Sequence, residues 1–62
     1  MSLQDIIKEK FGTQQKCADK LGWTKQKLSK IVLKKREARV SEINELANVL
    51  NESVEDIIIF LR

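Results

Sequence analysis

The apolar residues of this chain recur at intervals of three and four, and no segment shows a sustained alternation of apolar and polar residues. An interval of three or four places side chains on one face of an α-helix, whereas a half-buried strand repeats at every second residue. Proline, which interrupts helices, does not occur, and the two glycines stand at positions 12 and 22. The pattern predicts an all-α fold of short helices.

Capping residues divide the chain into five expected helices. The first three are expected at residues 3–11, 14–21 and 25–33, and the last two follow residues 41 and 53. The expected N-caps are Ser2, Thr13, Thr24, Ser41 and Ser53. Gly12 and Asn51 are expected to end their helices in the left-handed conformation, and Gly22 to break the second helix. A chain of 62 residues has room for one core, so residues 1–62 are expected to form a single compact domain.

Charge is distributed unevenly along the chain. The net charge is +3, but residues 1–19 are neutral, residues 20–39 carry eight basic residues and one acidic residue, and residues 40–62 carry five acidic residues and one basic residue. A clustered cationic segment is typical of a protein whose partner is a polyanion such as a nucleic acid. A solvated lysine-rich face would have the same composition, so charge alone leaves both interpretations open.

Several classes of protein are not expected. The single cysteine, Cys17, can form no internal disulfide, and without histidine a zinc site is not expected. The longest apolar run, Ile57–Leu61, has five residues, whereas a membrane-spanning helix needs about 20. The chain shows no secretory signal, phosphate-binding glycine loop or recognisable carboxylate pair. We therefore expect a soluble, cytoplasmic, non-enzymatic protein without a cofactor, a metal or a small-molecule ligand.

Residues 13–32 have the features of a helix-turn-helix. Gly22, Trp23 and Thr24 form the joint between the second and third expected helices, where glycine gives backbone freedom and threonine caps the following helix. Ala18, on the inner face of the second helix, is small enough to let the two helices approach closely. Two helices joined by three or four residues that include glycine fit this motif. The Trp23 ring is expected to pack over the joint.

The third expected helix leaves a polar, cationic face uncovered. A helix fits the major groove of a duplex, where long hydrogen-bonding side chains near its N-terminus reach the base edges. The candidate base-reading residues are Lys25, Gln26 and Lys30. The candidate phosphate-binding residues are Gln14, at the start of the second helix, and Lys34, Lys35, Arg36 and Arg39, in the connection after the third. Ordinary surface polarity is the alternative for all of them.

The segment TQQKCADKLGWTKQKLSKIV, residues 13–32, resembles the helix-turn-helix of the phage repressor and Cro family, the lambda-repressor-like or XRE-type domains. The resemblance continues through ELANVLNESVEDII, residues 45–58. It implies a compact all-helical domain of five helices that binds operator DNA, usually as a symmetric dimer, in a bacterial or phage-infected cell. The family's base-reading positions fall on Lys25, Gln26 and Lys30. The resemblance also places Lys27 near the DNA, as a further phosphate-binding candidate.

Two functions of different classes follow. The leading hypothesis is a sequence-specific transcriptional regulator that represses by occupying an operator as a homodimer. The alternative is a protein-interaction module, such as an antitoxin or an antirepressor, that uses the apolar C-terminal helix. The candidate contact residues there are Ile57, Phe60 and Leu61, which either form a dimer contact or close the core. Non-specific nucleic-acid packaging is disfavoured, because the neutral and acidic flanks differ from the overall cationic character of packaging proteins.

Overall fold

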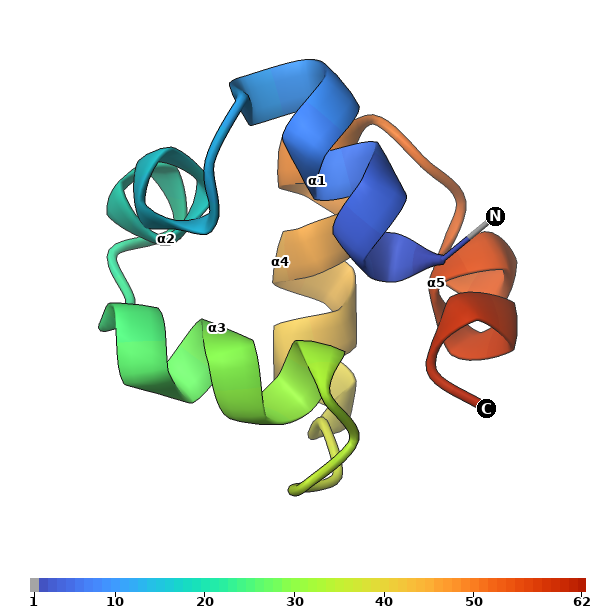
Figure 1. Ribbon diagram of the computed structural model, residues 1–62. Helices are drawn as coiled ribbons and strands as arrows, with labels where there is room; N and C mark the ends of the chain where they lie inside the picture. The colour runs from blue at the N-terminus through green and yellow to red at the C-terminus, as the bar shows by residue number, and fades with distance from the viewer. Residues whose placement is uncertain (1) are drawn as a thin grey trace.

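The computed structural model of the protein describes residues 2–62 and contains five helices and no strand within that range (Figure 1). The helices are α1 (Leu3–Phe11), α2 (Gln14–Leu21), α3 (Lys25–Val32), α4 (Val40–Leu50) and α5 (Val54–Phe60). The prediction of an all-α, five-helix fold is confirmed. None of the helices in the described range is long and apolar enough to cross a membrane.

Four of the five expected N-caps are confirmed by their hydrogen bonds. The side chains of Ser2, Thr13, Thr24 and Ser53 each accept a hydrogen bond from the backbone N–H three residues later. At α1 the cap is reciprocal, because the Asp5 carboxylate also accepts from the Ser2 backbone N–H at 3.2 Å. These bonds satisfy N–H groups that the first turn of a helix cannot pair internally.

The predicted cap of α4 at Ser41 is wrong. The helix begins one residue before it, at Val40, and Arg39 occupies the N-cap position with extended backbone angles of φ −76° and ψ 161°. Glu42 explains the difference: its carboxylate accepts a hydrogen bond from the Arg39 backbone N–H at 2.8 Å. An acidic side chain reaches back to the N-cap from the third helical position. That geometry places the cap at residue 39 and leaves Ser41 exposed in the first turn.

Helix α4 lies at the centre of the domain, with α1 and α2 packed on one part of it and α5 on another (Figure 1). The chain turns from α4 into α5 at Asn51, which has the expected left-handed conformation with φ 55° and ψ 44°. Lys10 of α1 donates to the Leu50 carbonyl oxygen and lies 3.6 Å from the Glu52 carboxylate, so α1 also closes the C-terminal end of α4.

One apolar core fills the space between the helices. Its fully buried large side chains come from all five helices: Leu3, Ile7, Leu28, Ile31, Leu46, Leu50 and Ile57, with Cys17. Burying a side chain of this size stabilises the fold by about 1.5–3 kcal/mol relative to leaving it in water. The inner face of α3 is thereby committed to the core, and its outer face stays in solvent.

Candidate nucleic-acid interface

The joint between α2 and α3 has a fixed geometry. Gly22 adopts the left-handed conformation, with φ 76° and ψ 23°, and the Trp23 backbone N–H donates to the Ala18 carbonyl oxygen at 2.9 Å. Thr24 then starts α3, because its hydroxyl oxygen accepts from the Lys27 backbone N–H at 3.1 Å. Ala18 on α2 is completely buried, and α2 and α3 are in contact with each other. The joint therefore presents α3 at a set angle to α2.

The outer face of α3 carries all three candidate base-reading residues. Lys25, Gln26 and Lys30 are exposed, and they line one shallow hollow of about 380 Å³ together with Lys35. The structure thus brings the base-reading candidates and one phosphate-binding candidate onto a single surface, with long donors at the N-terminal end of the helix. This is the disposition that reading a major groove requires.

Sequence reasoning missed two residues on this surface. Ser29 and Leu33 line the same hollow, and Leu33 is 51% exposed although it is apolar. Both continue the stripe that begins at Lys25, at intervals of four residues, so helical spacing alone identifies them. An exposed leucine on a polar face adds an apolar contact of the kind that a thymine methyl group accepts.

A second hollow, of about 390 Å³, opens next to the first, between α1, the start of α2 and α3. Gln14 lines it from the first position of α2, and Lys25 lines it from the first position of α3. Lys8 of α1 also lines it and was not predicted as a site residue. The positive end of a helix dipole beside two lysines favours an anionic group such as a phosphate.

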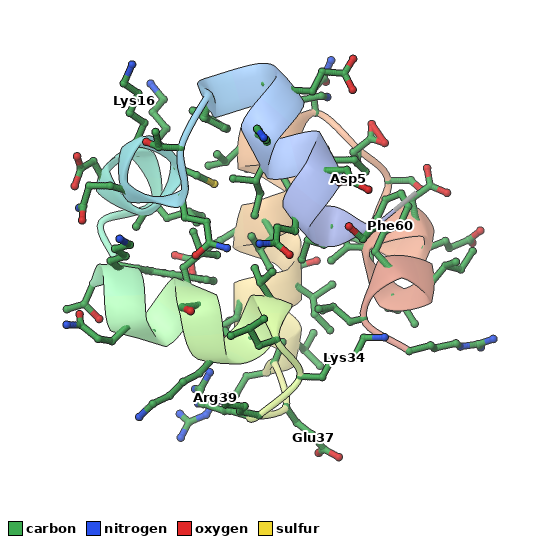
Figure 2. All side chains as sticks on the ribbon, viewed as in Figure 1. Asp5, Lys16, Lys34, Glu37, Arg39 and Phe60 are labelled. Atoms are coloured by element: carbon green, nitrogen blue, oxygen red, sulfur yellow. The ribbon has the colours of Figure 1, made fainter. Side chains whose placement is uncertain are left out.

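The side chains of the basic connection after α3, residues 33–39, lie in different surroundings. Lys35 lines the hollow on α3, and Arg39, the last residue of the connection, is exposed (Figure 2). Lys34 has a left-handed backbone, with φ 62°, and its ammonium group donates to the Arg62 carbonyl oxygen. In Figure 2 its side chain extends toward the end of α5, away from α3. The four cations of this connection therefore do not form one continuous surface.

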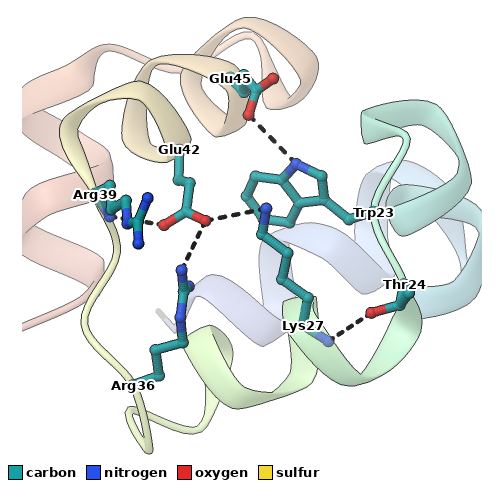
Figure 3. Close-up of polar contacts among 7 residues, drawn as sticks. All are labelled: Trp23, Thr24, Lys27, Arg36, Arg39, Glu42 and Glu45. Atoms are coloured by element: carbon teal, nitrogen blue, oxygen red, sulfur yellow. Dashed lines mark hydrogen bonds and ion pairs between the residues drawn. The ribbon is translucent and has the colours of Figure 1, made fainter.

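The remaining two phosphate-binding candidates, Lys27 and Arg36, converge on Glu42 (Figure 3). Nζ of Lys27 lies 3.1 Å and Nη2 of Arg36 lies 2.9 Å from the same carboxylate oxygen. Glu42 itself is only 4% exposed. The hydrogen bond from Arg36, with that from the Arg39 backbone N–H, lowers the pKa of Glu42 to about 2, so its negative charge is present at all physiological pH values.

The Trp23 ring is partly buried against the core. Its Nε1–H donates to the Glu45 carboxylate at 3.3 Å, and Nζ of Lys27 lies 4.6 Å from the ring centroid (Figure 3). A cation over an aromatic face is attracted by the ring's quadrupole. Lys27 therefore lies between an aromatic ring and a buried carboxylate.

The contact surface predicted on the C-terminal helix needs correction at one residue. Ile57 has no exposed surface and belongs to the core, because α5 turns this side chain toward α4. Phe60 and Leu61 are partly buried against the core. The exposed apolar side chains of α5 are instead Val54, Ile58 and Ile59, of which Ile59 is 59% exposed.

Cys17 occupies the inner face of α2, as its position in the sequence predicts, and has no exposed surface. Burial raises the pKa of its thiol to about 11, because the charged thiolate loses its hydration there. The thiol is therefore protonated at neutral pH. A buried, neutral thiol behaves as a small apolar side chain.

The chain was compared with protein families, curated proteins and solved structures. A family model described as helix-turn-helix covers residues 3–57, which extend from the first residue of α1 into α5. No curated protein and no solved structure gives a significant match to the chain.

Proposed function

Because the chain belongs to the XRE-type, lambda-repressor-like helix-turn-helix family and is thus a DNA-binding regulator, we propose that it binds a specific operator in double-stranded DNA and represses transcription by occupying it. In this role α3 enters the major groove and reads bases with Lys25, Gln26 and Lys30. Lys35 and Arg39 bind phosphates beside the groove, and Gln14 binds another at the start of α2.

The observation that supports this proposal most directly is the segregation of the two faces of α3. Leu28, Ile31 and Val32 are buried in the core, and the opposite face has three long donors in one hollow. A helix that only completed the core would not need long donors gathered on its outer face, two of them at its N-terminal end. Base contacts from such a face confer specificity, and the flanking cations supply affinity that depends on salt concentration.

A homodimer is part of the proposal. A single domain of this size buries little surface on DNA, and a two-fold pair reads two half-sites about 34 Å apart, one turn of the duplex. The exposed apolar side chains of α5, Ile58 and Ile59, are the contact we propose between the two copies. These side chains are also the surface that a protein-interaction module would use, so the two functional hypotheses are separated by the cationic surface of α3, which only a DNA-binding function requires.

Selection of bound duplexes from a random library of about 30 base pairs, about three turns of DNA, tests this function. We expect enrichment of a two-fold symmetric site. Enrichment of a single half-site would retain α3 as the reading helix but refute the dimer. Binding without enrichment would reduce the function to phosphate attraction, and no binding at moderate salt would refute it altogether.

A further inference from the structure

The Glu42 carboxylate joins three parts of the domain that the DNA-reading surface depends on. Lys27 comes from α3, Arg36 from the basic connection, and the Arg39 backbone N–H from the N-cap of α4. All three donors lie 2.8–3.1 Å from one buried carboxylate. The Glu42 cluster, defined as Glu42, Lys27 and Arg36, therefore connects α3 to α4 through the segment that carries the flanking cations.

The head groups of both cations in the cluster are held against the protein. Nη1 of Arg36 has almost no exposed surface and no hydrogen-bond partner among the described residues, so this nitrogen faces the protein although the Arg36 side chain as a whole is 34% exposed. Lys27 lies between Glu42 and the Trp23 ring. By contrast, Lys25, Lys30 and Lys35 are exposed and have no carboxylate partner within 4.0 Å among the described residues.

Releasing either cation to a phosphate would leave a buried carboxylate with fewer partners. Breaking a buried ion pair by removing one partner is strongly destabilising, because the remaining charge stays out of water without compensation. A contact between an exposed lysine and a phosphate does not carry this penalty. Phosphate binding should therefore fall to the exposed cations and leave the Glu42 cluster intact.

We propose that Glu42 is a positioning residue of the DNA-reading surface: it withholds Lys27 and Arg36 from phosphate, and it fixes α3 and the basic connection against α4. This inference rests on the proposed function, since it concerns how that function is made specific. Withholding two cations lowers the attraction that acts on every DNA sequence alike, and holding α3 in place preserves the base contacts. Glu42 thus raises the ratio of specific to non-specific affinity.

The variant Glu42→Gln tests the proposal with little change in shape. The glutamine oxygen still accepts from the Arg39 backbone N–H, but the negative charge that holds Lys27 and Arg36 is gone. Affinity for the selected operator and for an unrelated duplex is measured across a series of salt concentrations. We expect the plot of log affinity against log salt to steepen by ~0.9 for each cation released to phosphate, and the specificity ratio to fall.

Glu45→Gln is the matched control. It lies in the same helix and removes the same charge, but Glu45 is exposed and accepts from the Trp23 indole rather than from a cation. It should leave the salt slope within error of the unchanged protein. An equal steepening in both variants would mean that net charge alone controls the slope, which would overturn the role of Glu42.

A second experiment replaces one cation at a time. Its result does not depend on whether the Glu42→Gln protein is stably folded. Arg36→Gln in the otherwise unchanged protein should leave the salt slope unaltered, whereas Lys35→Gln should make it shallower by ~0.9. A shallower slope for Arg36→Gln would show that Arg36 already contacts phosphate, and would refute the proposal.

Titration of the Glu42 carboxyl carbon by NMR, in the free protein, separates failure of this inference from failure of the proposed function. If the protein binds no duplex but its Glu42 carboxylate stays ionised down to pH 3, the Glu42 cluster is supported and the DNA-binding role is refuted. A carboxyl that titrates in the ordinary range would refute the cluster whatever the DNA result.

Discussion

The indole N–H of Trp23 donates a hydrogen bond to the carboxylate of Glu45 at 3.3 Å, and this bond ties the joint of the helix-turn-helix to the middle of α4 (Figure 3). The ring also packs against the core and carries Lys27 on its face. Trp23 therefore contributes through its apolar surface as well as through one hydrogen bond, and the two contributions can be separated by substitution.

We expect Trp23→Phe to lower the free energy of unfolding by about 1 kcal/mol, because it keeps an aromatic ring and loses one exposed hydrogen bond. Trp23→Ala should cost more, about 2–3 kcal/mol, since most of the ring's packing is lost as well. Urea unfolding followed by circular dichroism measures both, because Trp23 is the only tryptophan and its fluorescence disappears in each variant. Equal losses in the two variants would mean that the hydrogen bond, not the ring, carries the stabilisation.

Gln26 and Lys35 should affect DNA binding in different ways. Gln26→Ala should change the base preference at one position of the operator, with a loss of about 1–3 kcal/mol for the preferred base pair. Lys35→Ala should weaken binding to all duplexes alike and make the salt slope shallower by about 1. Repeating the duplex selection with each variant provides the measurement. A uniform loss on every sequence for Gln26→Ala would contradict the assignment of this residue to base reading.

Much of the fold could be predicted because its signals are local. The caps at Thr13 and Thr24 and the left-handed turn at Gly22 each depend on a few neighbouring residues, and the structure confirms them. The cap at Ser41 was mispredicted because serine is the commoner capping residue. The side chain that decides the boundary is Glu42, whose position in the first turn fixes the cap three residues earlier.

The division of the cations into exposed ones and ones that pair with Glu42 could not be predicted in the same way. Lys27, Arg36 and Glu42 are separated by up to fifteen positions, and only the folded arrangement of α3, the basic connection and α4 brings them together. In the sequence, Glu42 is one of five acidic residues in an acidic segment, and nothing there marks it as buried. Positive charge within the segment 20–39 therefore predicts that phosphate is attracted, but not which side chains bind it.

The ion pairs of Glu42 should make stability depend on pH in the acid range. The folded-state pKa is about 2 and the ordinary value is 4.5, so the stabilisation is complete above pH 4.5 and is lost as the pH falls toward 2. We expect a loss of about 2 kcal/mol over this range, a figure reduced from the full shift because Lys27 and Arg36 remain partly exposed.

Comparison with Glu42→Gln isolates this effect from the titration of other carboxyl groups. The difference in unfolding free energy between the two proteins, measured by urea unfolding at pH 6, 4 and 3, should shrink as the pH falls. Glutamine does not titrate, so other groups contribute equally to both proteins. A difference that stays constant over this range would show that Glu42 has an ordinary pKa in the folded state.

Substitutions of exposed and buried apolar side chains of α5 should affect self-association and stability separately. Ile59 is 59% exposed, so Ile59→Lys should leave the free energy of unfolding of the monomer nearly unchanged and weaken the dimer that we propose. Ile57→Ala is the matched contrast on the same helix. Ile57 is fully buried, and its truncation should cost about 2–5 kcal/mol of stability.

Sedimentation equilibrium, together with binding to a full symmetric site and to a single half-site, measures the effect of Ile59→Lys. If α5 forms the contact between copies, the variant should lose the extra affinity for the full site and keep its affinity for the half-site, because α3 is unaltered. A variant that still binds the full site cooperatively would place the dimer contact on another surface. Ile58 and Ile59 would then remain available to a different protein, which is the alternative function.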